Sequence, residues 1–468
     1  MIDVRTIATS SLGDRSYLAH DGEVALVIDP QRDIDRVLAL ADELGVRITH
    51  VAETHIHNDY VTGGLELARR LDAVYLVDAR DHVAFDRTPA REGHDIAIGS
   101  MRLRPIATPG HTHHHLSYAL SDATVDESGQ VEAVFTGGSM LYGTTGRTDL
   151  VSPDDTVELT HAQYHSVRRL VDELPADATV FPTHGFGSFC SATPPSGEAS
   201  TVGEQRSTNP ALTSDEQDFV DTLVAGLGAY PAYYARMAPT NSAGPEPVDL
   251  SLPEPVSPDE LRGRLEKGLA AGQWVVDLRE RTAFAGGHLA GSLSFQLAQP
   301  FVTYLGWLLP DDADLTLIGE TEQQVADARR ELVRIGIDRL AGATTGPIDD
   351  LAGGTDLASY RVSDFAGLAD RDPARVVVVD ARTENERAGG GVAGSLHLPL
   401  HELLARRDEI PDGEVWIYCG SGYRASVAAS LLAAQPGRHR DLVVVNDDWP
   451  HAAQAGLAVV RDDDRRAA

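Results

Sequence analysis

A run of side chains that commonly bind metal ions occupies residues 54–64, THIHNDYVTGG. His55, His57 and Asp59 alternate along it, and imidazoles at positions i and i+2 just after a strand can converge on one ion. A further ligand has to come from a distant segment. In TPGHTHHHLSY the best candidate is His111, because adjacent histidines cannot all point in one direction, and we expect the others to be ordinary loop residues.

A second candidate for chemistry is the thiol in VWIYCGSGYRASVAASLLAAQ. An apolar strand ends at Cys419, a tight loop with glycines follows, and Arg424 opens a predicted helix. A thiolate there faces the loop N–H groups and the positive end of the helix dipole, which favour this nucleophilic form. Arg424 can bind an anionic sulfur donor. The expected substrate-binding residues of the loop are Gly420, Ser421, Gly422 and Tyr423.

The plainer alternative for this thiol is a buried cysteine in a strand-to-helix turn, but the glycine spacing and the arginine favour a nucleophile. Tyrosine phosphatases place a longer anion-binding loop between cysteine and arginine, so the shorter loop fits sulfur better than phosphate. Without such a context, a lone cysteine such as Cys190 is most often buried filler.

Length and composition limit the classes of protein to consider. With 468 residues the chain is too long for one hydrophobic core, so we expect about two to four domains. Two cysteines argue against a disulfide scaffold and indicate a reducing compartment. The net charge of -32 argues against nucleic acid and anionic membranes as partners. No apolar run is long enough to span a membrane and no signal-peptide pattern is present, so we expect a cytoplasmic protein.

The pattern of elements predicts an α/β protein with several domains. Short β-rich runs such as VALVID and AVYLV alternate with helical stretches such as DIDRVLALADELG over residues 1–190. Residues 200–240 are predicted to be helical. The segment that follows is rich in proline and small residues and is predicted to be a linker, 241–257.

The C-terminal half contains an internal repeat, VVDLRERTAFAGGHLAGSLSFQL and later VVDARTENERAGGGVAGSLHLPL. Each copy combines a strand, a helix and a second strand, and two such copies of about 100 residues indicate two small parallel α/β domains of one fold. In the first copy Gly319 stands where the second has Cys419, and Gln324 replaces Arg424. The first copy is therefore predicted to be catalytically inactive.

Residues 355–465 resemble the rhodanese family of sulfurtransferases, through the Cys-x-x-Gly-x-Arg loop, the VVVVDAR strand end and DDWPHAAQAGLAV. The resemblance implies that Cys419 carries a persulfide that passes to a thiol or cyanide, with Arg424 and the loop amides binding the substrate. Residues 258–348 resemble an inactive rhodanese domain. One departure in the second copy is GGGVAGSLHLP, where the family often has a Gly-His pair.

Four segments of the first half, in this order, resemble the metallo-β-lactamase fold: THIHNDY, TPGHTHHHLSY, VFTGGSMLYGTTGRTDL and VFPTHGFGS. The resemblance implies an αββα sandwich over residues 1–240. The finer match is to persulfide dioxygenases, through IDP, GRTDL, TVGEQRSTNPAL and YYARM. That branch implies one non-haem Fe(II), O₂, a glutathione or coenzyme A-type persulfide as substrate, and sulfite as product.

Two departures from that branch leave the metal site open. The family triad of two histidines and one carboxylate maps to His55 and His111, but its carboxylate position is Gly138. Tyr60 stands where dinuclear hydrolases of the fold have another histidine for a second metal. A dinuclear zinc hydrolase is therefore disfavoured.

The candidate metal ligands are His55, His57, Asp59 and His111. They leave three alternatives: a zinc site of three histidines, an iron site in which Asp59 or water fills the vacancy, and a metal-free domain. A Gly138→Asp change is expected to raise the affinity for iron. Arg147 in GRTDL is a candidate to bind a glutathione carboxylate, the alternative being a structural salt bridge.

Three functions remain open at this point. The first is a fusion enzyme of sulfane-sulfur metabolism, whose N-terminal domain binds or oxidises a glutathione-type persulfide while Cys419 exchanges sulfane sulfur. The second is a sulfurtransferase alone, and the third is a thioester hydrolase of the hydroxyacylglutathione type, which Gly138 and Tyr60 disfavour. The expected partners are a small persulfide or thiosulfate and a thiol acceptor; a homodimer would suit the fold, although no motif indicates one.

Overall fold

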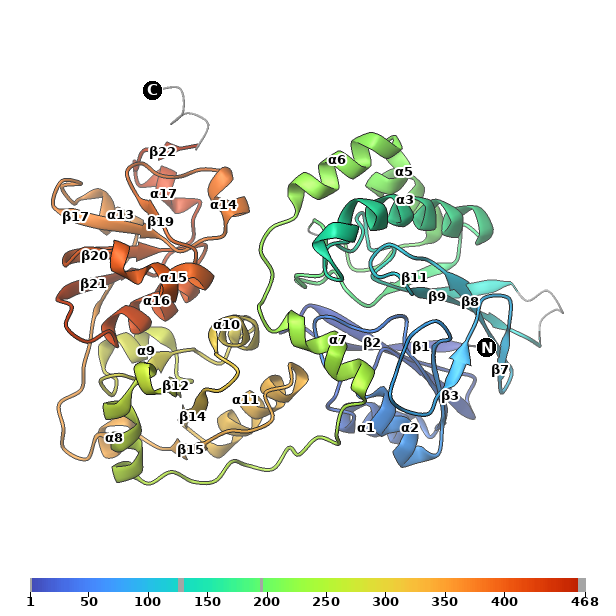
Figure 1. Cartoon of the computed structure of the whole chain (residues 1–468), viewed down its shortest axis with the longest axis horizontal. Coiled ribbons are helices and arrows are strands. Elements are labelled where there is room, and N and C mark those ends of the chain that lie inside the picture. The colour runs from blue at the N-terminus through green and yellow to red at the C-terminus, as the bar shows by residue number, and fades with distance from the viewer. Residues whose placement is uncertain (1, 125–129, 194–196, 462–468) are drawn as a thin grey trace. The chain divides into compact units, whose positions relative to one another are not determined.

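The computed structural model describes residues 2–124, 130–193 and 197–461 (Figure 1). The chain divides into two compact units, residues 1–249 with 332–336 and residues 250–331 with 337–468. The boundary at residue 249 lies inside the segment predicted to be a linker, 241–257. Among the helices of the described residues, none is both long and apolar enough to cross a membrane.

The first unit is built on two β-sheets. The six-stranded sheet has the order β1-β2-β3-β4-β5-β6, antiparallel up to β3 and parallel from there on. Its strands are β1 Asp3–Thr9, β2 Asp14–His20, β3 Val24–Ile28, β4 Arg47–Ala52, β5 Val74–Asp78 and β6 Thr88–Ala90. The five-stranded sheet has the order β11-β10-β9-β8-β7, in which only β10 and β11 are parallel. Its strands are β7 Ile96–Ile98, β8 Met101–Ala107, β9 Leu116–Asp122, β10 Val131–Gly137 and β11 Thr179–Pro182.

Helices cover the outer faces of both sheets, which gives the predicted αββα sandwich (Figure 1). Side chains such as Tyr17 and Phe135 fill the space between the sheets, because alternate residues of each strand point inward. Two further cores lie between sheet and helices, one under α1 and α2 and one under α3 to α6. The helices are α1 Asp35–Leu44, α2 Gly64–Leu71, α3 Thr156–Glu173, α4 Val202–Thr208, α5 Pro210–Thr213, α6 Glu216–Gly226 and α7 Tyr234–Ala243.

The second unit contains the two repeats, each with its own parallel sheet. The first sheet has the order β13-β12-β14-β15, and the second has β16-β21-β20-β17-β19. The equivalent strands β19, β17, β20 and β21 follow the same order as the first sheet, so both repeats share one topology. The elements of the first repeat are α8 Pro258–Lys267, β12 Gln273–Asp277, α9 Arg281–Gly286, β13 Leu293–Ser294, α10 Phe301–Leu308, β14 Asp314–Gly319, α11 Glu322–Arg334, β15 Gly342–Thr345 and α12 Ile348–Ala352.

The second repeat adds a small two-stranded sheet to its parallel one, formed by β18 and β22. Its strands are β16 Arg361–Ser363, β17 Val376–Asp380, β18 Gly391–Val392, β19 Leu396–His397, β20 Gly413–Tyr418, β21 Arg440–Val445 and β22 Val459–Val460. Its helices are α13 Phe365–Ala369, α14 Glu384–Ala388, α15 Leu403–Arg406, α16 Tyr423–Ala433 and α17 His451–Gln454.

The same ion pair closes the central strand of each repeat. Asp277 and Arg279 pair at 2.7 Å after β12, and Asp380 and Arg382 pair at 2.7 Å after β17. Each arginine also donates to the carbonyl of a glycine eight residues later in the chain. Both aspartates are buried acceptors of several hydrogen bonds, so each holds the loop that follows its strand.

Helix α16 packs against both repeats. Every residue from Tyr423 to Leu432 is buried, because the helix contacts β20 and β21 of its own repeat and β13 of the other. Ser430 accepts a hydrogen bond from the N–H of Ser294 at 3.0 Å, and the hydroxyls of Ser294 and Ser426 lie 3.0 Å apart. The helix that follows Cys419 is therefore enclosed by the two copies together.

Candidate functional site

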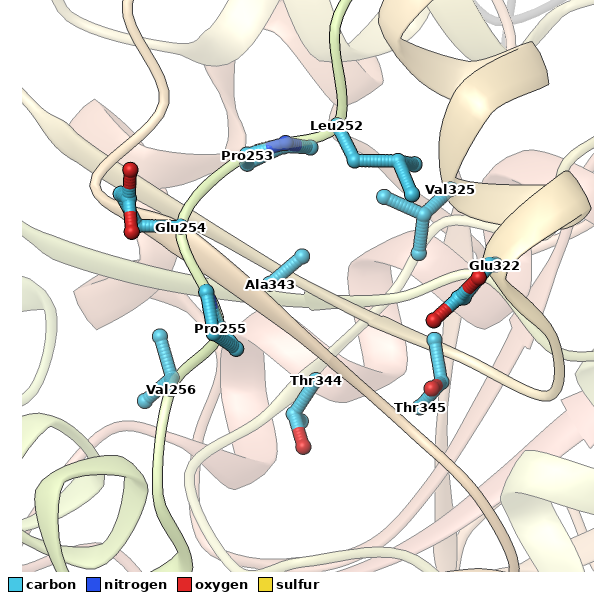
Figure 2. Close-up of a pocket in the computed structure, with 10 residues that line it drawn as sticks. All are labelled: Leu252, Pro253, Glu254, Pro255, Val256, Glu322, Val325, Ala343, Thr344 and Thr345. Atoms are coloured by element: carbon cyan, nitrogen blue, oxygen red, sulfur yellow. The ribbon is translucent and has the colours of Figure 1, made fainter.

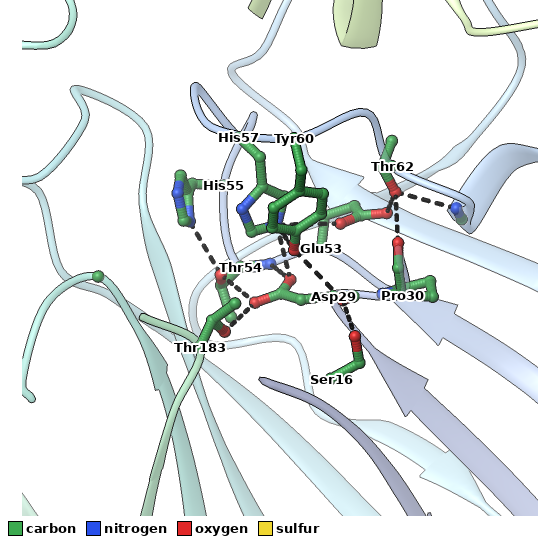
Figure 3. Close-up of polar contacts among 12 residues, drawn as sticks. Ser16, Asp29, Pro30, Glu53, Thr54, His55, His57, Tyr60, Thr62 and Thr183 are labelled. Atoms are coloured by element: carbon green, nitrogen blue, oxygen red, sulfur yellow. Dashed lines mark hydrogen bonds and ion pairs between the residues drawn. The ribbon is translucent and has the colours of Figure 1, made fainter. Parts of the chain in front are cut away.

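Asp29 is the centre of the polar network that supports the N-terminal site (Figure 3). It follows β3 in the left-handed backbone region, with φ 51°, and its side chain is fully buried. The carboxylate accepts hydrogen bonds from the N–H of Thr54 at 2.7 Å, from the Thr54 hydroxyl at 2.6 Å and from the Thr183 hydroxyl. Burial alone would raise the pKa of Asp29, but the nearby His57 and these bonds hold it below its usual value.

His57 faces the acidic side of this network (Figure 3). Its Nε2 atom lies 3.3 Å from an oxygen of Asp29, 3.3 Å from an oxygen of Glu53 and 3.0 Å from the hydroxyl of Tyr60. Burial lowers the pKa of His57, but the two carboxylates outweigh it and raise the pKa to about 9. Tyr60 also stacks on this imidazole, with ring centroids 4.3 Å apart. Tyr60, which stands where dinuclear hydrolases of the fold have a histidine, therefore supports the ring of His57.

Asn241 of α7 also holds the loop of residues 54–64 in place. Its amide group donates to the carbonyl oxygens of His57 and Tyr60, both at 2.9 Å, and its oxygen accepts from the N–H of Thr62 at 2.9 Å. All of these groups are buried. The sequence assigned Asn241 to the predicted linker, 241–257, but α7 extends to Ala243. No local signal marks Asn241 as a positioning residue.

Three further imidazoles, those of His55, His111 and His184, lie around one space, with ring centroids 4.8 to 5.3 Å apart. His55 Nδ1 pairs with a threonine hydroxyl at 2.9 Å, and His111 Nδ1 donates to a backbone carbonyl at 2.7 Å. His184 Nδ1 lies 2.9 Å from a carboxylate oxygen of Asp14. Such outer hydrogen bonds fix the tautomer and leave Nε2 free to bind a metal.

The inner nitrogen atoms of these imidazoles face one another. His55 Nε2 and His184 Nε2 lie 3.3 Å apart, and His111 Nε2 has no hydrogen-bond partner among the described residues. Burial and the neighbouring imidazoles lower the pKa of His55 well below its usual value, so His55 is neutral and accepts the proton of His184. Burial and the charge of His184 lower the pKa of His111 to about 3. Neutral imidazoles with free lone pairs are the form that binds metals.

His184 is charged through two aspartates. Its Nδ1 atom lies 2.9 Å from Asp14 and 3.1 Å from Asp59. Burial lowers the pKa of His184, but both carboxylates raise it, to about 10 overall. Burial and the charge of Asp59 raise the pKa of Asp14 to about 8. Asp59 therefore pairs with His184 in this geometry.

The candidate ligand atoms form three groups that share His184. His55, His57 and His184 make the first group, and His111, His184 and Cys190 make the second; within each, the ligand atoms lie within 4.8 Å of one another. The predicted set of His55, His57, Asp59 and His111 does not form a single group, because Asp59 instead joins Asp14 and His184. The residues present fit a metal ion held mainly by imidazoles. The sequence placed His184 at a strand end but did not include it among the ligands.

The position expected to carry a carboxylate is filled by a neighbouring ring. A Cβ atom at Gly138 would lie 2.2 to 2.7 Å from ring atoms of His111, and one at Gly146 would lie 2.7 Å from His111 Nδ1. The imidazole of His111 is thus enclosed by two glycines. A carboxylate side chain at residue 138 fits only if His111 moves, so the expected gain in iron affinity of Gly138→Asp does not follow from this geometry.

The histidines of residues 111–115 lie partly in the site and partly near the surface. His115 was expected to be an ordinary loop residue, but it is fully buried and stacks on His55 with ring centroids 5.0 Å apart. Its Nε2 atom accepts from the N–H of Gly138 at 3.1 Å, which makes it a support rather than a ligand. His113 and His114 are more exposed and pair with aspartates at 3.1 and 3.0 Å.

Arg147 is occupied by the protein itself. Its guanidinium makes a bidentate ion pair with Asp149 at 2.6 and 2.7 Å and donates to the carbonyls of Phe189 and Gly228. It also lies over the ring of Tyr230. This geometry favours the structural salt bridge over the predicted contact with a glutathione carboxylate.

The loop after Cys419 has the geometry that a reactive thiol needs. Cys419 is buried directly after β20, and the N–H of Gly422 donates to its sulfur at 3.1 Å. Gly422 has φ 93°, and a Cβ there would collide with Asn446, so only glycine fits this turn. Helix α16 begins at the next residue, Tyr423, and its N-terminal end faces the sulfur.

Arg424 extends from this helix to an acidic partner. It forms a bidentate ion pair with Glu386 of α14 at 2.5 and 2.6 Å. Burial raises the pKa of Glu386, but the hydrogen bonds and charge of Arg424 outweigh it and lower the pKa. An incoming anion therefore shares Arg424 with a carboxylate, which fixes the orientation of the guanidinium.

The first repeat forms one wall of this site. A small pocket beside Arg424 is lined by Tyr304 and Trp307 of α10 and by His401 of the second repeat. The guanidinium of Arg424 lies 5.8 Å from the ring centre of Tyr304, and Trp307 stacks on His401 with centroids 4.8 Å apart. The first repeat thus contributes side chains to the pocket beside Arg424.

The equivalent site of the first repeat is closed. Gln324, in place of the arginine, accepts from the N–H of Glu320 at 2.7 Å and donates to the carbonyl of Leu278 at 3.1 Å. A larger pocket nearby, at the end of β15, offers neither a thiol nor a cationic side chain (Figure 2). Its lining residues are Leu252, Pro253, Glu254, Pro255, Val256, Glu322, Val325, Ala343, Thr344 and Thr345. This repeat has no place for an anionic sulfur donor of the kind expected at Cys419.

Comparisons with known proteins divide the chain in the same way. The rhodanese-like domain model matches residues 363–451, within the second repeat. The human mitochondrial persulfide dioxygenase ETHE1 is 31% identical over 216 residues, which cover 46% of this chain and 75% of that protein. A hydroxyacylglutathione hydrolase of Rhodospirillum rubrum is 29% identical over 225 residues, 42% of this chain and 80% of that protein.

Among solved structures, a metallo-β-lactamase from Staphylococcus aureus subsp. aureus COL matches with a TM-score of 0.65 and 28% identity. The match covers 74% of this chain and 99% of that chain. The metallo-β-lactamase fold expected for the N-terminal half is therefore confirmed.

Gly138→Ala tests whether His111 needs the space that the glycine leaves. The added Cβ should displace the imidazole, lower the free energy of unfolding by about 1–3 kcal/mol and reduce the amount of metal retained. Urea unfolding followed by circular dichroism and metal analysis after dialysis would measure both. Gly226→Ala is the control, since a Cβ there meets nothing within 4 Å. Equal stability and metal content in both variants would contradict the role assigned to Gly138.

The stability of the metal-free first unit should fall as the pH rises from 8 to 10. The pKa values of His57 and His184 are raised in the folded state to about 9 and 10, so their stabilising contribution is complete below about pH 6.5 and disappears above pH 10. Lys267 is the only lysine and lies in the second unit, so lysines do not contribute to the pH dependence of the first unit.

Urea unfolding at several pH values, in the presence of a chelator, would measure this effect. All four tryptophans lie after residue 249, so tryptophan fluorescence reports the second unit alone and serves as an internal control. Circular dichroism should show the additional loss of stability. A transition that is independent of pH between 8 and 10 would contradict the charged state of both imidazoles.

Proposed function

Since the chain belongs to the family of the persulfide dioxygenase ETHE1 and carries a rhodanese-like domain, we propose that it processes sulfane sulfur at two sites. Cys419 exchanges sulfur between small donors and thiols. The N-terminal site binds a low-molecular-weight persulfide of the glutathione type and oxidises it. The observation that carries the proposal is the Cys419 loop, in which an N–H at 3.1 Å, a helix N-terminus and Arg424 surround one buried sulfur.

The sulfur exchange needs no oxidant. The Cys419 thiolate attacks the outer sulfur of a persulfide or thiosulfate, the S–S bond of the donor breaks, and the donor leaves as a thiolate or as sulfite. An acceptor thiolate then attacks the outer sulfur of the Cys419 persulfide and restores the thiolate. Arg424 and the loop N–H groups stabilise the negative charge throughout. These steps account for a thiosulfate or persulfide donor and a thiol acceptor as partners.

The N-terminal site supports the second half of the proposal through its imidazoles. The imidazoles of His55, His111 and His184 surround the space that would hold a metal, and His57 lies beside it. A bound iron would supply the one-electron chemistry that a reaction of persulfide with O₂ needs. The residues around it exclude water, since all four imidazoles are buried. Oxidation of one persulfide with one O₂ and one water balances to a thiol, sulfite and two protons.

A thioester hydrolase is the rival function, suggested by the match to the hydroxyacylglutathione hydrolase. It would need a carboxylate between two metals. Gly138 cannot supply one, and His111 fills the space around it. Tyr60 is bound to His57 and offers no second-site imidazole. These two contacts argue against the hydrolase.

The test of the proposal is oxygen uptake by the iron-reconstituted full chain with glutathione persulfide, together with sulfur transfer from thiosulfate to cyanide. Cys419→Ser should abolish the transfer and leave oxygen uptake in place. Cys190→Ser should retain the transfer. Transfer that persists in Cys419→Ser would contradict the nucleophile, and absence of oxygen uptake in every variant would leave a sulfurtransferase alone. Hydrolysis of a glutathione thioester without oxygen uptake would favour the rival.

Tyr304→Ala tests the contribution of the inactive repeat. Removal of the ring should remove its contact with Arg424, which Glu386 still orients, and lower kcat/KM for sulfur transfer by about fivefold, which corresponds to about 1 kcal/mol of cation–π energy. Tyr304→Phe keeps the ring and should retain the rate. Equal rates in the alanine and phenylalanine variants would show that the first repeat has no effect on the site.

A further inference from the structure

Cys190 lies at the edge of the imidazole cluster, although the sequence marked it only as filler. It is fully buried, and its sulfur forms one group with ligand atoms of His111 and His184, all within 4.8 Å of one another. Thiolate and imidazole are the usual ligands of zinc and bind other first-row metals as well. The position alone is not sufficient, because buried cysteines are common.

An unpartnered nitrogen gives the second observation. His111 is fully buried, yet its Nε2 atom has no hydrogen-bond partner among the described residues. Its Nδ1 atom donates to the carbonyl of Arg147 at 2.7 Å, so Nε2 carries a free lone pair. A buried acceptor that lacks a donor costs free energy unless a ligand satisfies it. A metal ion bound between His111 and Cys190 would supply that partner.

The segment that carries Cys190 is held in place by its backbone. The carbonyl of Cys190 accepts from the N–H of Arg147 at 2.8 Å, and its own N–H donates to the hydroxyl of Ser188 at 3.2 Å. The sulfur has a weak contact with the hydroxyl of Tyr234 at 3.9 Å and also interacts with the carboxylate of Asp59. The backbone N–H of Arg147 thus donates to Cys190, and the backbone carbonyl of Arg147 accepts from His111. Arg147 therefore positions both residues.

The lack of a carboxylate at residue 138 explains why a thiolate ligand would suit this site. A triad of two histidines and one carboxylate supplies one negative charge to the metal. Gly138 removes that charge, and His111 takes up the space. A thiolate supplies the same charge from another direction. His184 can offer only Nε2 to a metal, because its Nδ1 faces Asp14 and Asp59, so one ion at a time can use it, in place of the proton now shared with His55.

We propose that Cys190 is the anionic metal ligand of the N-terminal site and that, with His111 and His184, it holds one divalent metal ion in a two-histidine, one-thiolate set. Binding replaces the thiol proton of Cys190 and the proton between His184 and His55, and both protons leave to solvent. The softer thiolate selects a thiophilic metal such as zinc or iron over magnesium or calcium. The assignment concerns the ligands alone and holds whichever reaction the domain catalyses.

The experiment uses Co(II) as the probe, because a cobalt–thiolate bond gives a sulfur-to-metal charge-transfer band in the near ultraviolet. The chain has two cysteines, so the Cys419→Ser protein contains Cys190 as its single thiol. The metal-free Cys419→Ser protein, titrated with Co(II), should bind one ion and show the band. This variant leaves Cys190 and its packing untouched, so the result does not depend on whether a Cys190 variant folds.

Cys190→Ser is the matched variant with Cys419 as its single thiol. It should lose the band and bind Co(II) about tenfold or more weakly. Cys190→Asp, which restores a carboxylate, should retain Co(II) without the band. The proposal is overturned if the Cys419→Ser protein binds Co(II) without a charge-transfer band, or does not bind it at all. A band in Cys190→Ser would place the metal on the second unit and would also overturn it.

Discussion

The N-terminal half depends on one buried negative charge. Asp29 holds the segments that follow three strands, and it does so from a left-handed backbone conformation that costs about 1 kcal/mol or more. Its charge is acceptable in the interior because the imidazolium of His57 lies 3.3 Å away and three hydroxyl or amide groups donate to it. This network fixes the loop of residues 54–64 and also orients two candidate ligands, because His57 contacts Asp29 directly and His55 contacts it through Thr54. The contacts of Asp29 with the Thr54 N–H and with Thr183 involve no candidate ligand, so they can hold the loop when a ligand is changed.

In each half of the molecule a glycine occupies a position where a functional side chain was expected, a carboxylate at residue 138 and a thiol at residue 319. In both places a neighbouring side chain occupies the site. At Gly138 the vacated volume is taken by His111, and at Gly319 the adjacent loop is closed by the amide of Gln324. The outcome differs because of what the neighbours offer. His111 brings a free nitrogen to the site, whereas Gln324 satisfies its own polar groups with the backbone. A cluster of candidate ligand atoms therefore remains near Gly138. At Gly319 the polar groups of Gln324 are already bound to the backbone.

Local signals account for the parts of the molecule that the sequence predicted. The strand before the Cys419 loop is largely apolar, the THIHNDY loop is marked by its alternating histidines, and the two repeats have matching sequences. Contacts between distant segments had no such signal. His184 depends on Asp14, Asn241 of α7 holds a loop near residue 60, and Tyr304 reaches the site of the other repeat. His115 was misjudged because its burial is set by the start of β9 and not by the histidine run.

Helix α16 has no face of its own toward solvent, since both repeats cover it. Its amide hydrogens can exchange only when the two copies separate or unfold together, so this helix should belong to the most slowly exchanging part of the second unit. Cys419 is thereby attached to an element that opens only when both repeats open. Loss of the first repeat would expose this helix, so the first repeat protects the Cys419 loop although it has no thiol at the equivalent position.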